Sequence, residues 1–146
     1  PTNIANSSVA AGAKLLTGGK VPAGFESGYY YEPTILDCAE PVVACVQEEI
    51  FGPVLSVLKF ETDAQALAMA NDSEYGLSGS IWTRDVGRAL RVSRGIETGA
   101  LSVNSNSSVR FWTPFGGFKQ SGLGRELGPD ALDSFTEVKN VFISND

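Results

Sequence analysis

Residues 54–104, VLSVLKFETDAQALAMANDSEYGLSGSIWTRDVGRALRVSRGIETGALSVN, carry the pattern that decides the fold. The stretch opens with a compact apolar run after Gly52-Pro53, as expected for a buried strand. Helix-capping residues, first Thr62 or Asp63 and later Asp85, precede two segments with apolar residues at helical spacing. We predict strands over 54–60, 77–83 and 100–104 and helices over 62–72 and 85–96. Strands and helices that alternate over short connections are typical of an α/β fold, a parallel sheet flanked by helices.

Shorter elements are expected on either side of this stretch. We predict a surface helix over 4–16, ended by Gly18-Gly19, a short strand or edge segment over 29–36, and a helix over 129–135. Residues 137–143 favour β-structure, and an exposed terminal strand tends to find a partner. This strand is expected to pair with the edge of its own sheet or with another subunit. The composition is that of one folded unit.

Composition and charge exclude several classes of partner. The 146 residues carry a net charge of -6, and no Lys/Arg stripe is present that could neutralise a phosphate backbone, so nucleic acid is not expected as a partner. No apolar run approaches the roughly 20 residues that cross a bilayer, and the first residues lack the features of a signal peptide. We therefore expect no membrane association and a cytoplasmic location.

The chain contains no histidine, which excludes Ser-His-Asp and Cys-His catalysis within it and removes the commonest metal ligand. No cluster of Cys, Asp and Glu has metal-ligand spacing, so no metal site is predicted. The two cysteines, Cys38 and Cys45, are too few for a disulfide framework. We interpret them as buried structural thiols.

A first unusual cluster, EEIFGPV at residues 48–54, places two carboxylates and an aromatic ring before the first predicted strand. Adjacent side chains of an extended chain point to opposite sides, so the two carboxylates are not expected to act as a catalytic pair. One of them could accept hydrogen bonds from the two hydroxyls of a ribose. The ring two residues further on would lie on the same side and could flank a flat heterocycle. A solvated charge beside a core phenylalanine is the alternative.

A second cluster, TPFGGFKQSGLGRE at residues 113–126, is rich in glycine. It matches neither the phosphate-binding pattern GxxxxGK[ST] nor the dinucleotide pattern GxGxxG after a strand. The alternative to a binding role is a tight, close-packed turn in which glycine permits positive φ and close backbone contact.

Four motifs then occur in a fixed order: EEIFGPV at 48–54, NDSEYGL at 71–77, PFGGFKQSGLGRELG at 114–128 and TEVK at 136–139. In sequence, order and spacing they resemble the aldehyde dehydrogenase family over essentially the whole chain. The resemblance implies that residues 1–135 are the C-terminal part of the catalytic domain. It also implies that residues 136–146 form a strand that joins the sheet of a neighbouring subunit in a homo-oligomer.

The same resemblance implies roles for individual residues. Glu49, the second glutamate of the first motif, would bind the nicotinamide ribose of NAD or NADP, and Phe51 would pack near the nicotinamide ring. The family's loop before Pro-Phe-Gly-Gly lines the tunnel for the aldehyde substrate. The corresponding candidates for the substrate pocket are Val109, Phe111, Trp112 and Phe115, of which the motif itself fixes Phe115.

In this family a cysteine thiolate attacks the aldehyde, a hydride passes to the cofactor, and a glutamate activates water to hydrolyse the thioester. The resemblance places those groups upstream of the region seen here, so no residue of this chain is assigned a catalytic role and the chain by itself is expected to be inactive. Two alternatives are a non-catalytic oligomerisation or binding module and a relative that reduces acyl-CoA or acyl-phosphate. The aromatic Phe111 and Trp112 also suggest an amino- or betaine-type aldehyde, because aromatic faces attract quaternary ammonium groups.

Overall fold

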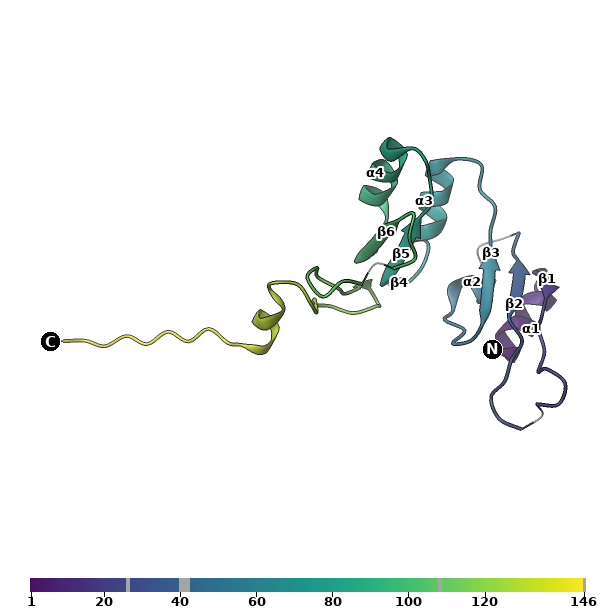
Figure 1. Ribbon diagram of the computed structural model, residues 1–146, viewed down its shortest axis with the longest axis horizontal. Coiled ribbons are helices and arrows are strands. Elements are labelled where there is room, and N and C mark those ends of the chain that lie inside the picture. Colours follow the sequence, from purple (N-terminus) through teal and green to yellow (C-terminus); the bar gives the residue numbers. More distant parts are fainter. Residues whose placement is uncertain (26, 40–42, 108, 146) are drawn as a thin grey trace. The chain divides into compact units, whose positions relative to one another are not determined.

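The computed structural model of the chain forms two compact units, Pro1–Asp72 and Ser73–Asp146, rather than the single unit that the composition suggests. It describes residues 1–25, 27–39, 43–107 and 109–145. We call the two parts the first and the second unit and describe each by itself (Figure 1). Each unit has its own small β-sheets and helices, so the fold class is α/β, as the sequence predicts.

The first unit is built on a three-stranded sheet with the order β1-β2-β3. The central strand β2 pairs antiparallel with β1 and parallel with β3. The elements of this unit are α1 (Thr2–Ala10), β1 (Lys14–Thr17), β2 (Thr34–Asp37), α2 (Ala44–Gln47), β3 (Val54–Val57) and α3 (Asp63–Asn71).

The core of the first unit lies where α1 and α2 pack against β2. Leu36 of β2 is completely buried, and the core residues around it are Ala5, Ala13, Cys38, Val43 and Cys45. Both cysteines are free and buried, which confirms their interpretation as buried thiols. The core is therefore small and is assembled from short elements that are distant in sequence.

Three predictions for this unit are wrong in detail. The first helix ends at Ala10 instead of residue 16, because Gly12 adopts a φ of 107° that a right-handed helix cannot continue, and Lys14–Thr17 form a strand. The strand expected over 29–36 starts only after Pro33 and is central, not an edge. The strand expected to be buried over 54–60 ends at Val57 and alternates between half-buried and exposed residues, because β3 is an edge of its sheet.

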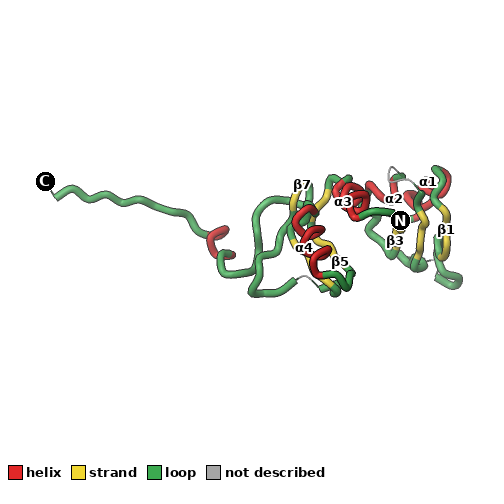
Figure 2. Tube along the Cα trace, turned by 90° about the horizontal axis from the view of Figure 1, so that it is seen from above, coloured by secondary structure: helices red, strands yellow, loops and turns green. Residues whose placement is uncertain are grey.

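The second unit contains two pairs of strands. β5 (Ser78–Ile81) and β6 (Ala100–Val103) pair in parallel and are connected through the helix α4 (Val86–Gly95) (Figure 2). β4 (Tyr75–Gly76) pairs antiparallel with β7 (Phe118–Lys119). The strand-helix-strand order predicted for residues 77–104 is confirmed.

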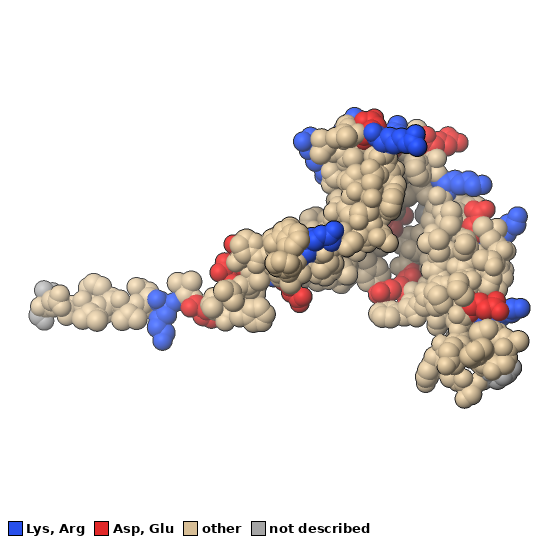
Figure 3. All heavy atoms as spheres, viewed as in Figure 1, with Lys and Arg blue, Asp and Glu red and all other residues tan. Residues whose placement is uncertain are grey.

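Helix α4 begins where the sequence predicts. The Asp85 side chain accepts a hydrogen bond from the backbone N–H of Arg88 at 3.0 Å, and this bond lowers the pKa of the carboxyl group from its usual value. Basic side chains gather over the helix on the face shown in Figure 3. Within the described residues no helix is long and apolar enough to cross a membrane.

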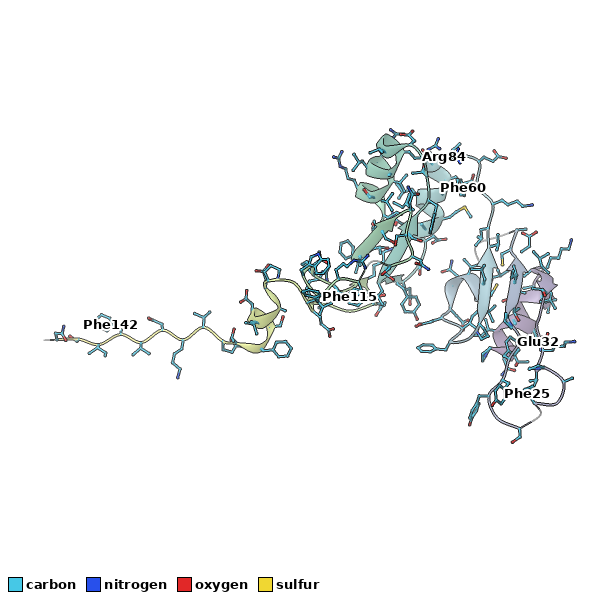
Figure 4. All side chains as sticks on the ribbon, in the orientation of Figure 1. Phe25, Glu32, Phe60, Arg84, Phe115 and Phe142 are labelled. Carbon is cyan, nitrogen blue, oxygen red and sulfur yellow. The ribbon has the colours of Figure 1, made fainter. Side chains whose placement is uncertain are left out.

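The C-terminal segment differs from its prediction. The helix expected over 129–135 is a short 3-10 helix, η1 (Ala131–Phe135). Residues 136–145 contain neither helix nor strand, and apolar side chains such as Val138 and Phe142 are exposed to solvent (Figure 4). Over the described residues the predicted strand thus pairs with no sheet of its own chain. Its pairing with another subunit stays a prediction.

The cap of α3 gives a test of local stability. The hydroxyl of Thr62 accepts a hydrogen bond from the backbone N–H of Gln65 at 3.1 Å. Thr62→Ala is expected to lower the free energy of unfolding by about 1 kcal/mol, because an N–H of the first turn loses its partner. Urea unfolding followed by circular dichroism measures the change. Thr62→Ser, which keeps a hydroxyl, is the control, and equal stabilities of the two variants would contradict the capping role.

Candidate functional site

Glu49 and Phe51 line the same cleft in the first unit. The segment 48–53 connects the end of α2 to the start of β3. The cleft has a volume of about 430 Å³, and its lining residues are Cys45, Glu48, Glu49, Ile50, Phe51, Gly52, Val54 and Ser56. The structure thus brings together the carboxylate and the ring that the sequence analysis singled out.

The backbone on both sides of Phe51 fixes the position of this segment. Glu48 is extended and ends α2, and Phe51 adopts a φ of 51°, which is uncommon for a residue with a side chain. After it, Pro53 accepts a hydrogen bond from the backbone N–H of Thr34 at 2.8 Å. The segment is therefore tied to β2. The backbone turns at Phe51 and is not extended there, so the rule that side chains alternate along an extended chain does not apply. Glu49 and Phe51 share the cleft because of this turn.

The two candidate side chains of the cleft, Glu49 and Phe51, are open to solvent. Glu49 is exposed, and the ring of Phe51 is 84% exposed. Phe51 is thus not a core residue, which removes the alternative of a charge beside a core phenylalanine. Strained backbone and exposed aromatic surface both occur frequently at ligand sites. Chemically, the carboxylate can accept hydrogen bonds from neutral hydroxyls, and the ring offers a flat apolar face.

In the second unit, two of the sequence motifs form one junction. β4 comes from the NDSEYGL motif and β7 from the PFGGFKQSG motif. The N–H of Gly76 donates to the hydroxyl of Ser121 at 2.9 Å, and the ammonium group of Lys119 lies 2.8 Å from the carboxylate of Glu97. Sequence reasoning treated the motifs separately and missed this contact, because nothing in either motif reveals its partner.

The glycines of this junction allow backbones to touch. A Cβ atom added to Gly99 would meet the carbonyl oxygen of Gly116 at 1.7 Å, a distance that no side chain could occupy. The Arg125 guanidinium group donates to the carbonyl of Gly117 at 2.9 Å and lies 5.5 Å from the centre of the Phe118 ring. The structure confirms the interpretation of this segment as a close-packed turn.

The residues proposed to shape the substrate pocket all lie in the second unit. Phe111 and Trp112 contact each other edge to face, with ring centroids 4.5 Å apart, and both are exposed, as is Val109. Phe115 is half-buried and exchanges two backbone hydrogen bonds of 2.7 Å with Glu126 (Figure 4). It lines a pocket of about 410 Å³ with the motif residues Leu77 and Gly117 and with Phe135 of η1, among others. The backbone pairing with Glu126 therefore holds Phe115 in place, whereas Val109, Phe111 and Trp112 are exposed.

Comparison with known proteins decides the family. Residues 2–141 match the aldehyde dehydrogenase family. This chain belongs to that family. It is 43% identical over 133 residues to betaine aldehyde dehydrogenase of Bacillus subtilis, which covers 90% of this chain and 27% of the relative.

Solved aldehyde dehydrogenases share the fold. The chain is similar to Mycobacterium tuberculosis aldehyde dehydrogenase in complex with NAD+, with 40% identity, a TM-score of 0.88, and coverage of 93% of this chain and 28% of that one. It is also similar to indole-3-acetaldehyde dehydrogenase of P. syringae in complex with NAD+, with 41% identity, a TM-score of 0.89, and coverage of 94% and 28%. The chain thus spans little more than a quarter of the length of the aldehyde dehydrogenases it matches.

One residue of the cleft was not predicted from the sequence. Cys45 lines the same cleft as Glu49 and Phe51, although the sequence analysis treated it only as a structural thiol. It lies four positions before Glu49, and the short helix α2 and the turn after it bring it to the cleft wall. No signal in the sequence could have placed it there.

The contact between Gly99 and Gly116 can be tested by substitution. Gly99→Ala is expected to lower the free energy of unfolding by about 3 kcal/mol, because the new methyl group forces two backbone segments apart. Gly87→Ala in α4 is the matched control, since the nearest atoms to its Cβ are side-chain atoms, the carboxylate of Asp85 at 3.1 Å and the guanidinium group of Arg91 at 3.3 Å. This control is expected to change the free energy of unfolding by less than about 1 kcal/mol. Thermal and urea unfolding measure the stability of both variants. If Gly99→Ala is as stable as Gly87→Ala, the backbones of Gly99 and Gly116 are not in close contact.

Proposed function

We propose that this chain forms part of an NAD-dependent aldehyde dehydrogenase and supplies the nicotinamide half of its cofactor site. In this proposal Glu49 binds the hydroxyls of the nicotinamide ribose and Phe51 packs near the nicotinamide ring. The observation that carries it is the shared cleft, in which the exposed carboxylate of Glu49, next to that of Glu48, and the exposed ring of Phe51 lie on a turn tied to β2. NAD is favoured over NADP because the similar solved enzymes are complexes with NAD+.

The chemistry of the cleft fits this cofactor. A carboxylate offers two acceptor oxygens, which suits the two neighbouring hydroxyls of a ribose. When bound, NAD+ accepts the hydride that leaves the aldehyde carbon. The residues of this chain bind and orient the cofactor. The turn at Phe51 holds both side chains on a backbone that α2 and β3 fix from either side.

The nucleophile and the general base are proposed to lie outside residues 1–146. Cys38 and Cys45 are buried, and the family resemblance implies that the nucleophilic cysteine lies upstream of this region. We therefore expect no aldehyde oxidation by these 146 residues alone. In the whole protein, residues 1–135 would belong to the catalytic domain.

The C-terminal segment 136–146 is proposed to be a strand that adds to the sheet of a second subunit. Its exposed apolar residues, Val138, Val141, Phe142 and Ile143, support this role. A β-prone segment that forms no strand in its own chain over the described residues 136–145 is suited to pair with another chain. The protein would then be a homo-oligomer.

The substrate is proposed to be an aldehyde with a quaternary ammonium or amino group. Phe111 and Trp112 expose aromatic faces that can attract a cation. The similarity to a relative named betaine aldehyde dehydrogenase supports this substrate class.

The cofactor proposal is tested by NAD+ binding to the intact protein. Glu49→Gln is expected to raise the Kd for NAD+ about ten- to a hundredfold, because a hydrogen bond to a charged group contributes about 1.5–3 kcal/mol. Glu61→Gln, at an exposed glutamate that does not line the cleft, is the matched control and is expected to change the Kd by less than about threefold. Calorimetry measures binding, and NADH absorbance measures turnover.

Equal losses in the two variants would contradict the role of Glu49. The 146 residues expressed alone serve as a further control. Formation of NADH by this piece would contradict the placement of the nucleophile elsewhere.

The substrate proposal is tested with two aldehydes of the same shape. Betaine aldehyde carries a quaternary nitrogen where 3,3-dimethylbutanal carries a carbon. Trp112→Ala is expected to lower kcat/KM for betaine aldehyde about two- to fivefold more than for the neutral aldehyde, the worth of an exposed cation–π contact. Trp112→Phe, which keeps an aromatic face, should retain most of the preference. If Trp112→Ala lowers kcat/KM by the same factor for both aldehydes, Trp112 does not recognise the positive charge.

A further inference from the structure

Two thiols that the proposed cofactor site does not use lie in contact in the first unit. The sulfur atoms of Cys38 and Cys45 are 3.4 Å apart. Cys38 follows the end of β2, and Cys45 lies in α2. The exposed fractions of the two residues are 2% and 6%. The two thiols are therefore buried in contact with each other.

The backbone around both thiols is held by hydrogen bonds to other elements. The N–H of Cys45 donates to the hydroxyl of Ser8 at 2.9 Å, and the hydroxyl of Ser56 donates to the Cys45 carbonyl at 2.6 Å. The N–H of Cys38 donates to the carbonyl of Val57 at 2.9 Å. The fold thus fixes the two sulfurs beside each other. They would need to approach by about 1.4 Å to reach the length of a disulfide bond.

The surroundings make the two thiols chemically unequal. Burial, together with the hydrogen bond and the charge of Cys45, raises the pKa of the Cys38 thiol to about 11. Burial also acts to raise the pKa of Cys45, but hydrogen bonds with Ser8, Ser56 and Cys38 outweigh it and lower that pKa. The thiolate is the reactive form of cysteine. We therefore expect Cys45 to react before Cys38.

Access to the pair comes from the cofactor cleft. Cys45 and Ser56 both line the cleft that contains Glu49 and Phe51. A small oxidant that enters this cleft reaches its wall at Cys45. A larger reagent would be excluded by the low exposure of both thiols.

We propose that Cys38 and Cys45 form a dithiol redox site, which hydrogen peroxide oxidises to a disulfide at the wall of the Glu49–Phe51 cleft. The Cys45 thiolate attacks one peroxide oxygen, the O–O bond breaks, and Cys45 becomes a sulfenic acid while hydroxide leaves. The sulfur of Cys38 then attacks the sulfur of Cys45, the S–O bond breaks, and the second oxygen leaves with the Cys38 proton. Two thiols lose two electrons in total, and one peroxide is reduced to two waters.

The sequence makes this site easy to read by mass spectrometry. No Lys or Arg lies between Lys20 and Lys59, so trypsin leaves both cysteines in one peptide, residues 21–59. The intact protein is treated with hydrogen peroxide, quenched with catalase, alkylated with iodoacetamide in denaturant and digested. The expected peptide has lost two hydrogen atoms and carries no alkyl group. A peptide that keeps both alkyl groups, or that carries sulfinic or sulfonic acid on separate cysteines, would overturn the proposal.

Single serine variants assign the order of the two thiols. In Cys38→Ser, Cys45 is expected to stop at the sulfenic acid, which dimedone traps. In Cys45→Ser, loss of the Cys38 thiol is expected to be at least about tenfold slower than thiol loss in the unsubstituted protein, because the remaining thiol stays protonated. Dimedone labelling of Cys38 in place of Cys45 would overturn the proposed order.

The location of the dithiol beside the cofactor rests on the proposed function, and NAD+ separates the two ideas. With NAD+ at about ten times its Kd, disulfide formation is expected to slow about tenfold, because bound cofactor fills the cleft. An unchanged rate while calorimetry shows NAD+ bound would overturn the location. If NAD+ does not bind, the proposed function is contradicted, and the measurement with peroxide alone still decides whether the disulfide forms.

Discussion

The parallel pairing of β2 with β3 is the constraint on which the cleft and the thiol pair both depend. Two hydrogen bonds close the ends of this pairing, one from the N–H of Thr34 to Pro53 and one from the N–H of Cys38 to Val57. The first fixes the turn that carries Glu49 and Phe51, and the second fixes Cys38. Since Leu36 at the middle of β2 is completely buried, slipping the register by one residue would expose it and separate the groups of the cleft.

The cleft also joins two kinds of chemistry in one small volume. Its outer surface presents an exposed carboxylate and ring, which suit a ligand, and its wall includes a thiol that has a second thiol in contact. A group that binds in the cleft therefore controls access to the thiols, and a change at the thiols alters the wall of the cleft. This coupling is possible because α2 has only four residues, and one of them, Cys45, belongs both to the core and to the wall of the cleft.

In the second unit, motif residues serve mainly to bring backbones together. Ser121 satisfies the N–H of Gly76, and Gly99 and Gly116 approach as closely as the absence of a side chain allows. This junction holds Phe115, whose backbone pairs with that of Glu126, in a defined place. Phe111 and Trp112 are instead exposed.

The sequence by itself determined the elements whose causes are local. The starts of α3 and α4 could be predicted because Thr62 and Asp85 cap their own helices, and the strands around α4 because apolar runs flank it. The motif residues Glu49, Phe51 and Phe115 could be named from the family resemblance.

Only the tertiary structure decided the short first helix, the central place of β2, the contact between Gly99 and Gly116, and the position of Cys45 on the cleft wall. The C-terminal segment, for which the sequence predicts a strand, forms none in this chain, because a strand needs a partner edge. Each of these depends on groups far apart along the chain, and a single sequence does not record which distant groups meet.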